Sequence, residues 1–392
     1  MPLEINDDRY SRLELITWWD QDILKKANIL VVGCGALGNE IVKNLTMLGA
    51  GNICVVDMDK VEKSNLTRSV LFRQEDEGLS KAEVICKRAK EINNEINIRY
   101  FDGNIFNFGL GVFSGFDLVL GGLDNREARL FINQSCWKIN KPWIDGAIEV
   151  LTGVARMFIP PDNACYECTM SEIDYKLINK RKSCMLLGLD EIAEGKIPTT
   201  PTIASIIAGV QVQEAVKYLH NREDLIVLNG KGFIFNGNNN DSYIIEYQKN
   251  DDCPSHYTFE HIEKVDIYFT EAKISDVIEY GKKYFGDDNF RIEFNNEVVY
   301  ELEDEKKKEA KEYFGNMNLM SVKDVRLKDG NLLKIRSFHS LNSGTSLTNK
   351  LLNKKLTDLK IPFNDILTLR KNEDEVQIEF RSMDIFNLIK LE

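Results

Sequence analysis

A glycine-rich turn constrains the fold of this chain more than any other feature. An apolar, β-prone run at residues 28–32 leads directly into the sequence GCGALG at residues 33–38, and a helical pattern begins at Asn39. Glycines at such a turn let backbone N–H groups and the start of a helix approach a phosphate. The turn therefore predicts a strand–turn–helix unit that binds a nucleotide.

The alternation of strands and helices continues after this turn. Strands are expected at 52–56, 96–100, 116–120 and 143–145, and helices at 39–48, 82–92, 126–138 and 202–219. This order is typical of an α/β, doubly wound, Rossmann-like domain with a mostly parallel sheet. Ligands of such domains collect at the carboxyl ends of the strands, where Asp57 and Asp124 also lie.

The length of the chain and a change in its composition predict two domains. A chain of 392 residues is long for a single core, and its composition changes after His256. Beyond that residue cysteine disappears, and Lys, Glu and Asn become more frequent. A helix is expected there at 274–285, with short strands at 265–269, 290–294, 298–302, 332–338, 366–369 and 376–380. We predict a nucleotide-binding domain at residues 1–256 and a smaller α+β domain at 257–392.

Charge and hydropathy exclude some classes of partner. The formal net charge of −12 disfavours nucleic-acid binding, which relies on Lys and Arg. No apolar run approaches the roughly 18 residues that span a bilayer. The polar, acidic N-terminus resembles neither a signal nor a transit peptide. We expect a soluble, cytoplasmic protein with no membrane or nucleic-acid partner.

The residues after the second strand indicate which nucleotide binds. Asp57 is placed to hydrogen-bond a ribose, the polar run at 64–68 ends in the cation Arg68, and Lys81 adds a second cation. An NAD-dependent oxidoreductase has no use for an arginine here, whereas an enzyme that expels pyrophosphate from ATP does. ATP is therefore favoured over NAD, and Asp124 is a candidate ligand for Mg²⁺. The predicted nucleotide site comprises Gly33, Gly35, Ala36, Gly38, Asp57, Asp59, Ser64, Asn65, Arg68, Lys81, Asp124 and Asn125.

These motifs carry a resemblance to a known superfamily. Residues 9–256 resemble the ubiquitin-activating enzymes, whose bacterial relatives adenylate the sulfur-carrier proteins of molybdopterin and thiamin synthesis. The matching motifs are the glycine turn, D-x-D-x-V-x-x-S-N-L-x-R at 57–68, Lys81, Asp124-Asn125, RYSR at 9–12 and PTTPTIAS at 198–205. Ser69 departs from the pattern, because the family usually has glutamine there.

The resemblance implies a reaction. The C-terminal glycine carboxylate of a small β-grasp protein attacks the α-phosphate of ATP, pyrophosphate leaves, and an acyl-adenylate remains. Arg12, Arg68 and Lys81 are expected to stabilise the developing charge, with Asp124 holding Mg²⁺. Because the family's arginine at the position of Arg12 reaches into the partner subunit's site, a homodimer is also implied.

Two pairs of metal-binding residues predict a zinc site. Cys165 and Cys168 form a C-x-x-C, and Cys253 and His256 form a C-x-x-H. Together they supply four ligands suited to tetrahedral Zn²⁺. The long separation makes spacing alone only suggestive, and a thioredoxin-like redox pair or unrelated thiols are the alternatives. The resembling family has two such knuckles at these places. Four protein ligands leave no open position, so we expect a structural metal.

Cys184 is the candidate nucleophile. The neighbouring cations Lys180, Arg181 and Lys182 favour its thiolate. In ubiquitin-activating enzymes a cysteine in this segment accepts the acyl group as a thioester, while sulfur-carrier enzymes can work without that step. An incidental loop thiol is the alternative. The remaining thiols are interpreted as packing residues: Cys34, Cys54, Cys86 and Cys136.

The favoured hypothesis is an activating enzyme for a ubiquitin-like protein that uses ATP, Mg²⁺ and structural Zn²⁺. The C-terminal region resembles, in texture only, the ubiquitin-like fold that recruits a conjugating enzyme; a dimerisation or capping domain is the alternative. Three other functions stay open. They are a sulfur-carrier adenylyltransferase, a non-catalytic nucleotide-binding regulator and, as a minor option, an NAD-dependent oxidoreductase.

Overall fold

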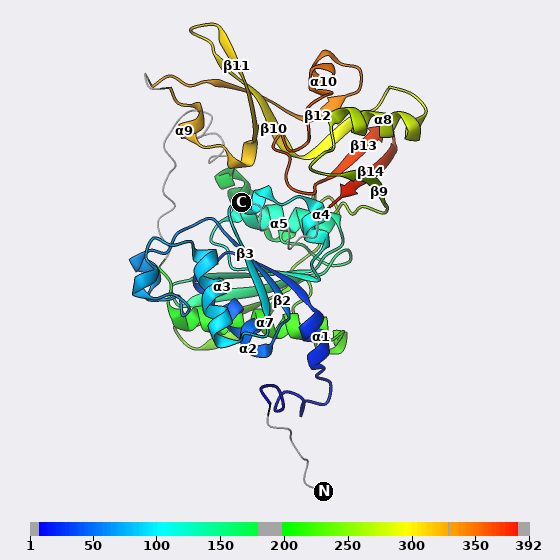
Figure 1. The fold of residues 1–392 in the computed structure, drawn as a ribbon. Coiled ribbons are helices and arrows are strands. Elements are labelled where there is room, and N and C mark those ends of the chain that lie inside the picture. The colour runs from blue at the N-terminus through cyan, green and yellow to red at the C-terminus, as the bar shows by residue number, and fades with distance from the viewer. Residues whose placement is uncertain (1–7, 179–197, 328–329, 383–392) are drawn as a thin grey trace.

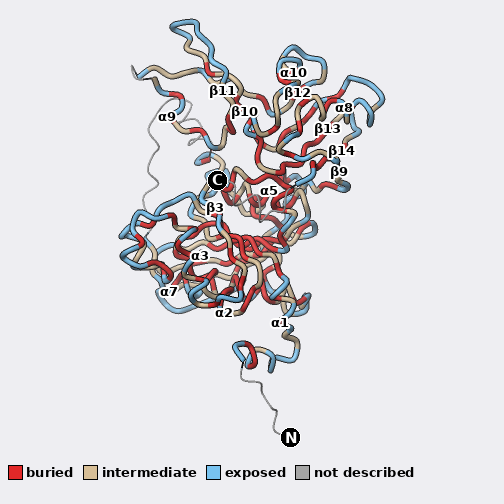
Figure 2. Tube along the Cα trace, viewed as in Figure 1, coloured by how far each residue is buried: buried red, intermediate tan, exposed pale blue. Residues whose placement is uncertain are grey.

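The computed structural model describes residues 8–178, 198–327 and 330–382. Two sheets lie one above the other, with helices α4 (Leu110–Ser114) and α5 (Arg126–Lys138) between them (Figure 1). Buried residues lie in the lower sheet, around α5 and in the upper sheet (Figure 2), which has a core cluster of its own. None of the helices in these ranges combines the length and the apolar character needed to cross a membrane.

The first sheet has eight strands in the order β3-β2-β1-β4-β5-β6-β7-β8. The strands are β1 (Asn28–Val32), β2 (Asn52–Asp57), β3 (Asn97–Asp102), β4 (Leu118–Gly121), β5 (Trp143–Glu149), β6 (Thr152–Phe158), β7 (Lys231–Asn236) and β8 (Asp241–Glu246). Neighbours from β3 to β5 pair in parallel, and those from β5 to β8 pair antiparallel. The predicted doubly wound domain with a mostly parallel sheet is confirmed.

Helices cover both faces of this sheet, because its central strands are apolar on both sides. Ile29 and Val31 of β1 belong to the core that includes α2 (Ala36–Leu48), α3 (Lys81–Ile92) and α7 (Pro201–Leu219). Leu30 and Val32 belong to the core with α4 (Leu110–Ser114) and α5 (Arg126–Lys138). A short helix, α1 (Gln21–Lys26), precedes β1.

The glycine turn joins β1 to α2 more tightly than expected. The helix begins at Ala36 rather than at Asn39, so the turn itself supplies its first residues. A Cβ atom on Gly38 would lie 1.8 Å from the carbonyl oxygen of Gly33, which has a φ of +95°. Only glycine fits at these two positions, so the turn keeps the start of α2 close to the end of β1.

The second sheet has six strands, ordered β11-β10-β13-β14-β9, with β12 also paired to β10. The strands are β9 (Ile262–Tyr268), β10 (Arg291–Asp304), β11 (Glu309–Asn316), β12 (Lys334–Asn342), β13 (Ile366–Lys371) and β14 (Asp374–Arg381). Its helices are α8 (Ile274–Phe285), α9 (Val322–Val325) and α10 (Ser346–Leu351). The predicted succession of strand, helix and further strands is present, and the ubiquitin-like identification stays a prediction.

The two sheets are joined by main-chain hydrogen bonds. Gly109 N donates to Phe363 O and Phe363 N donates to Asn107 O, both at 2.8 Å, while Gly111 N donates to Asn364 O at 2.8 Å. A Cβ atom on Gly109 would lie 2.4 Å from Asp365 Cα. This close contact fixes the C-terminal sheet on the first domain.

Asp365 is a buried carboxylate in this contact. Its Oδ1 accepts hydrogen bonds from Leu110 N at 3.1 Å, Asn295 Nδ2 at 3.0 Å and Ile366 N at 3.1 Å. Its Oδ2 has no hydrogen-bond partner within the described ranges. Burial raises the pKa of Asp365 to about 6, although the hydrogen bonds and the nearby Lys138 oppose the rise.

This pKa predicts a stability that falls as the pH rises from about 4 to 6. In that window the unfolded chain has already lost the proton of Asp365 while the folded chain retains it. This difference lowers the free energy of unfolding by up to about 3 kcal/mol as the pH rises. The variant Asp365→Asn keeps an acceptor and removes the charge, so it should lose this dependence. Urea unfolding of both proteins between pH 4 and 7 measures it, and parallel curves would contradict the prediction.

Candidate functional site

A cavity of about 1360 Å³ lies over the carboxyl ends of the first sheet. It is lined by the glycine turn, the loops after β2, β3 and β4, and parts of β5 and β6. The structure brings these predicted residues to its wall: Gly33, Gly35, Ala36, Asp57, Asp59, Asn65, Arg68, Lys81, Asp124 and Asn125. Gly38 and Ser64 are not part of the lining.

Asp57 connects the glycine turn to the loop after β2. Its Oδ2 accepts a hydrogen bond from Cys34 N at 2.6 Å, and its Oδ1 accepts one from Asp59 N at 2.7 Å. Burial raises the pKa of Asp57, while the charge of Lys81 and the two N–H donors oppose the rise. A carboxylate has about four acceptor positions, so acceptor capacity remains for ribose hydroxyls.

Lys81 is the first residue of α3 and points its ammonium group at the loop after β2. Its Nζ lies 2.8 Å from Asp59 Oδ2, and its backbone N–H donates to Asp59 O at 3.0 Å. Burial lowers the pKa of Lys81, but the charge of Asp57 and the bond to Asp59 outweigh this effect and raise it. The side chain is therefore a charged ammonium at neutral pH, only 12% exposed.

Arg68 is held by the turn that precedes it. Its Nη1 donates to the carbonyl oxygen of Ser64 at 2.7 Å, and the side chain of Asn65 accepts from Glu62 N at 2.9 Å. Ser64 thus supports Arg68 through its backbone rather than lining the cavity through its hydroxyl. The guanidinium retains donors for a phosphate.

Two further predicted residues lie at the start of α5. Asp124 is exposed and lines the cavity. Asn125 caps the helix, because its side chain accepts from Ala128 N at 2.8 Å. The side chain of Asn125 is therefore engaged in capping α5, while Asp124 is exposed to the cavity.

Arg12 lies away from the cavity of its own chain. Tyr10, two residues before it, contacts Gly49, which ends α2 at the opposite end from the glycine turn. Arg12 is exposed and is not part of the lining. The structure therefore does not bring Arg12 together with Arg68 and Lys81 within one chain.

A pair of arginines around one buried carboxylate was not predicted from the sequence. Asp145 of β5 is fully buried, and its Oδ1 accepts from Arg129 Nε at 2.8 Å while its Oδ2 accepts from Arg156 Nε at 3.1 Å. Burial lowers the pKa of Arg156, but the charge of Asp145 outweighs this effect and raises it. Both arginines line the cavity and add positive charge to it. The only signal in the sequence was Asp145 itself, an aspartate at the end of the strand expected at 143–145.

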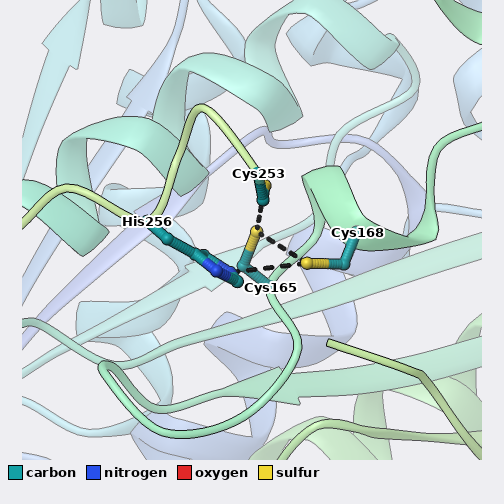
Figure 3. A group of neighbouring side chains, drawn as sticks. All are labelled: Cys165, Cys168, Cys253 and His256. Atoms are coloured by element: carbon teal, nitrogen blue, oxygen red, sulfur yellow. Dashed lines mark hydrogen bonds between the residues drawn. The ribbon is translucent and has the colours of Figure 1, made fainter. Parts of the chain in front are cut away.

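The four predicted metal ligands converge on one point (Figure 3). The Sγ atom of Cys165 lies 3.7 Å from that of Cys168 and 3.6 Å from that of Cys253, and Cys168 Sγ lies 3.4 Å from His256 Nε2. Tetrahedral Zn–S bonds of about 2.3 Å place sulfur atoms about 3.8 Å apart. The donor set and its spacing therefore fit Zn²⁺.

The surroundings of these ligands favour a structural metal. The His256 ring stacks on Trp137 with centroids 4.7 Å apart, and Cys165 and Cys253 belong to the core beneath α5. The cluster lies in the core, and none of its four residues lines the cavity.

The other thiols divide into two groups. Cys34, Cys54, Cys86 and Cys136 are buried, as predicted for packing residues. Burial raises their pKa values, that of Cys86 to about 12, which disfavours reactive thiolates. Cys184 and its three neighbouring cations lie outside the described residues.

Comparison with known proteins shows a family match and similar activating enzymes. The ThiF family model matches residues 8–255. The chain is 30% identical over 234 residues to ubiquitin-like modifier-activating enzyme 5 of Dictyostelium discoideum, covering 55% of this chain and 59% of that protein. It is 37% identical over 162 residues to the NEDD8-activating enzyme E1 catalytic subunit of Arabidopsis thaliana, covering 38% and 36% respectively. The chain thus spans less than two thirds of these relatives.

Solved structures give the same picture. Escherichia coli MccB in complex with ATP aligns with a TM-score of 0.53 and 26% identity, covering 65% of this chain and 76% of MccB. These matches confirm the predicted resemblance to the superfamily of ubiquitin-activating enzymes and their bacterial relatives. Because the matched region extends over more than half of the sequence and includes the glycine turn, Asp57, Arg68, Lys81 and the metal ligands up to Cys253, the chain belongs to the ThiF family.

Proposed function

We propose that this protein is an ATP-dependent activating enzyme that adenylates the C-terminal glycine carboxylate of a ubiquitin-like protein in the cytoplasm. The observation that carries the proposal is the single cavity wall that holds the glycine turn, Asp57, Arg68 and Lys81. This wall offers N–H donors for phosphates, an acceptor for ribose and two cations where pyrophosphate leaves.

The cations act on the charge that develops in the reaction. A carboxylate oxygen of the substrate attacks the α-phosphorus, the bond to the bridging oxygen breaks, and pyrophosphate departs. Lys81, charged and only slightly exposed, and Arg68 stabilise the oxygens that gain charge. Asp124 is the residue that would hold Mg²⁺, which neutralises phosphate charge when bound.

The size of the cavity supports a second substrate beside the nucleotide. Ligand pockets usually measure about 300–1,000 Å³, and this cavity measures about 1360 Å³. Glu149, Thr152 and Val154, at the antiparallel half of the sheet, also line the cavity. An extended C-terminal tail is the kind of substrate that we place there.

A homodimer explains the position of Arg12. Because Arg12 lies near the far end of α2, it acts in this proposal on the nucleotide of the partner subunit.

The other two parts of the chain have supporting roles in this proposal. The zinc cluster stabilises the core around α5, and the C-terminal domain recruits a conjugating enzyme.

The acyl group is then transferred from the adenylate to the thiolate of Cys184, which forms a thioester as the bond to the phosphate breaks and AMP leaves. No cysteine lines the described part of the cavity, so a thiol acceptor must come from outside it. The same observation favours a second candidate function, which is adenylation of a sulfur-carrier protein without a thioester on the enzyme.

A gel experiment separates these two functions. We expect the enzyme, incubated with ATP, Mg²⁺ and β-grasp proteins ending in glycine, to form an adduct on a non-reducing gel that dithiothreitol removes. Cys184→Ala should abolish the adduct but keep ATP–pyrophosphate exchange, while the control Cys86→Ala should keep both. An adduct that survives in Cys184→Ala contradicts the thioester assignment. Exchange without an adduct supports the sulfur-carrier function.

A further inference from the structure

The C-terminal domain supplies part of the cavity wall. The lining includes residues beyond the region matched by the family model: Glu297, Met317, Asn318, Met320, Ile335 and Ser337. Two of them belong to the short helix η6 (Met317–Leu319), which follows β11. The cavity is therefore completed by a part of this chain that the family comparison does not cover.

Hydrogen bonds fix η6 against the first domain. The side chain of Asn316 accepts from Asn318 N at 3.0 Å and donates through Nδ2 to Phe106 O at 3.2 Å. Asn316 is only 4% exposed. Phe106 lies in the turn η3 (Ile105–Asn107), which follows β3, and residues 103–106 line the same cavity.

This turn is in direct contact with the residue predicted to bind ribose. Gly103 N donates to Asp57 O at 3.1 Å, and Asn104 Nδ2 donates to Met58 Sδ at 3.3 Å. A continuous series of contacts thus leads from Asp57 through residues 103–106 to η6. In a Rossmann-like site the phosphates lie at the glycine turn and the ribose at the acid after β2. The base must then extend beyond Asp57, away from the glycine turn and toward β3.

We propose that η6 forms the wall against which the base of the nucleotide packs, with Met317 and Asn318 as base-contacting residues. The inference rests on the proposed function, since it assumes that ATP binds here. The thioether of Met317 is suited to the face of an aromatic base. The C-terminal domain is then part of the nucleotide site and not only a recruiting module.

Asn318 also gives the site a preference among bases. Its Nδ2 donates to Asn296 Oδ1 at 2.9 Å, and within the described residues its amide oxygen accepts no hydrogen bond. That oxygen faces the base as an acceptor, so it pairs with the 6-amino group of adenine and repels the 6-oxo group of guanine. Asn318 is thus a specificity-determining residue for ATP over GTP.

Calorimetry on the full chain tests this inference with three probes: ATP, GTP and inorganic tripolyphosphate, each with Mg²⁺. Asn318→Ala should raise the Kd for ATP about three- to tenfold, reduce the preference for ATP over GTP, and leave the Kd for tripolyphosphate unchanged. Met317→Ala should weaken ATP and GTP alike and spare tripolyphosphate. Leu319→Ala is the matched control, because Leu319 lies on the same turn, is 37% exposed and is not part of the lining.

The outcomes distinguish this inference from the proposed function. Wild-type protein that binds no ATP overturns both. ATP binding that neither Asn318→Ala nor Met317→Ala changes overturns the base wall alone. Equal losses for ATP and tripolyphosphate also overturn it, because they would show a general disturbance of the cavity and not the loss of a contact with the base.

Discussion

Replacing Lys81 with alanine is expected to slow ATP–pyrophosphate exchange by about two to three orders of magnitude, the usual effect of removing one preorganised group that stabilises transition-state charge. The ammonium is positioned from two sides, by Asp59 at 2.8 Å and by its own place at the start of α3. Its pKa is raised, so the full charge is present at neutral pH. No reorganisation is needed when charge develops on the leaving pyrophosphate.

Lys63→Ala is the matched control for this prediction. Lys63 lies in the loop after β2, its side chain is 73% exposed, and it pairs with Glu77 at 3.6 Å outside the cavity lining. Exchange by Lys63→Ala should stay within about twofold of wild type. Equal rates in Lys81→Ala and Lys63→Ala would show that Lys81 is a surface charge with no part in the reaction.

Loss of the metal is expected to have the largest effect on stability. Cys168→Ala removes one of four ligands, so we expect the zinc content to fall from one ion per chain toward zero. The unfolding midpoint should fall by about 10 °C or more, because structural zinc binding contributes many kcal/mol to folding. Elemental analysis and differential scanning calorimetry measure the two effects.

The control here is Cys136→Ala. Cys136 is fully buried in the same core as Cys165 and Cys253 but is not part of the ligand cluster. This variant should retain the metal and lose only the packing of one sulfur atom. Purified wild-type protein without zinc, or a Cys168→Ala midpoint close to that of Cys136→Ala, would contradict the structural metal.

Elements with a clear local pattern were predicted well from the sequence. Helices α5 and α8 begin and end where their apolar periodicity indicated. The strand β11 was missed, because it is an edge strand whose first half (Glu309–Glu312) is exposed and mostly charged, and it shows no apolar alternation. The strands expected at 290–294 and 298–302 are one strand, β10, whose polar centre coincides with shifts of register and resembled a loop.

The candidate site divides in the same way. The glycine turn, Asp57 and Lys81 could be found because each belongs to a short motif tied to one element. The contacts of Asp145 with Arg129 and Arg156 join β5, α5 and β6, and no local sequence pattern predicts contacts between separate elements. The wall formed by η6 depends on how the two sheets dock, which periodicity cannot predict.

The most direct test of the central claim is ATP–pyrophosphate exchange measured with a panel of β-grasp proteins ending in glycine. The account predicts exchange that requires Mg²⁺ and one such partner, and that stops when the terminal carboxylate of that partner is converted to an amide. Exchange that persists with the amidated partner would contradict carboxylate activation, as would a lack of exchange with every partner while ATP binds normally.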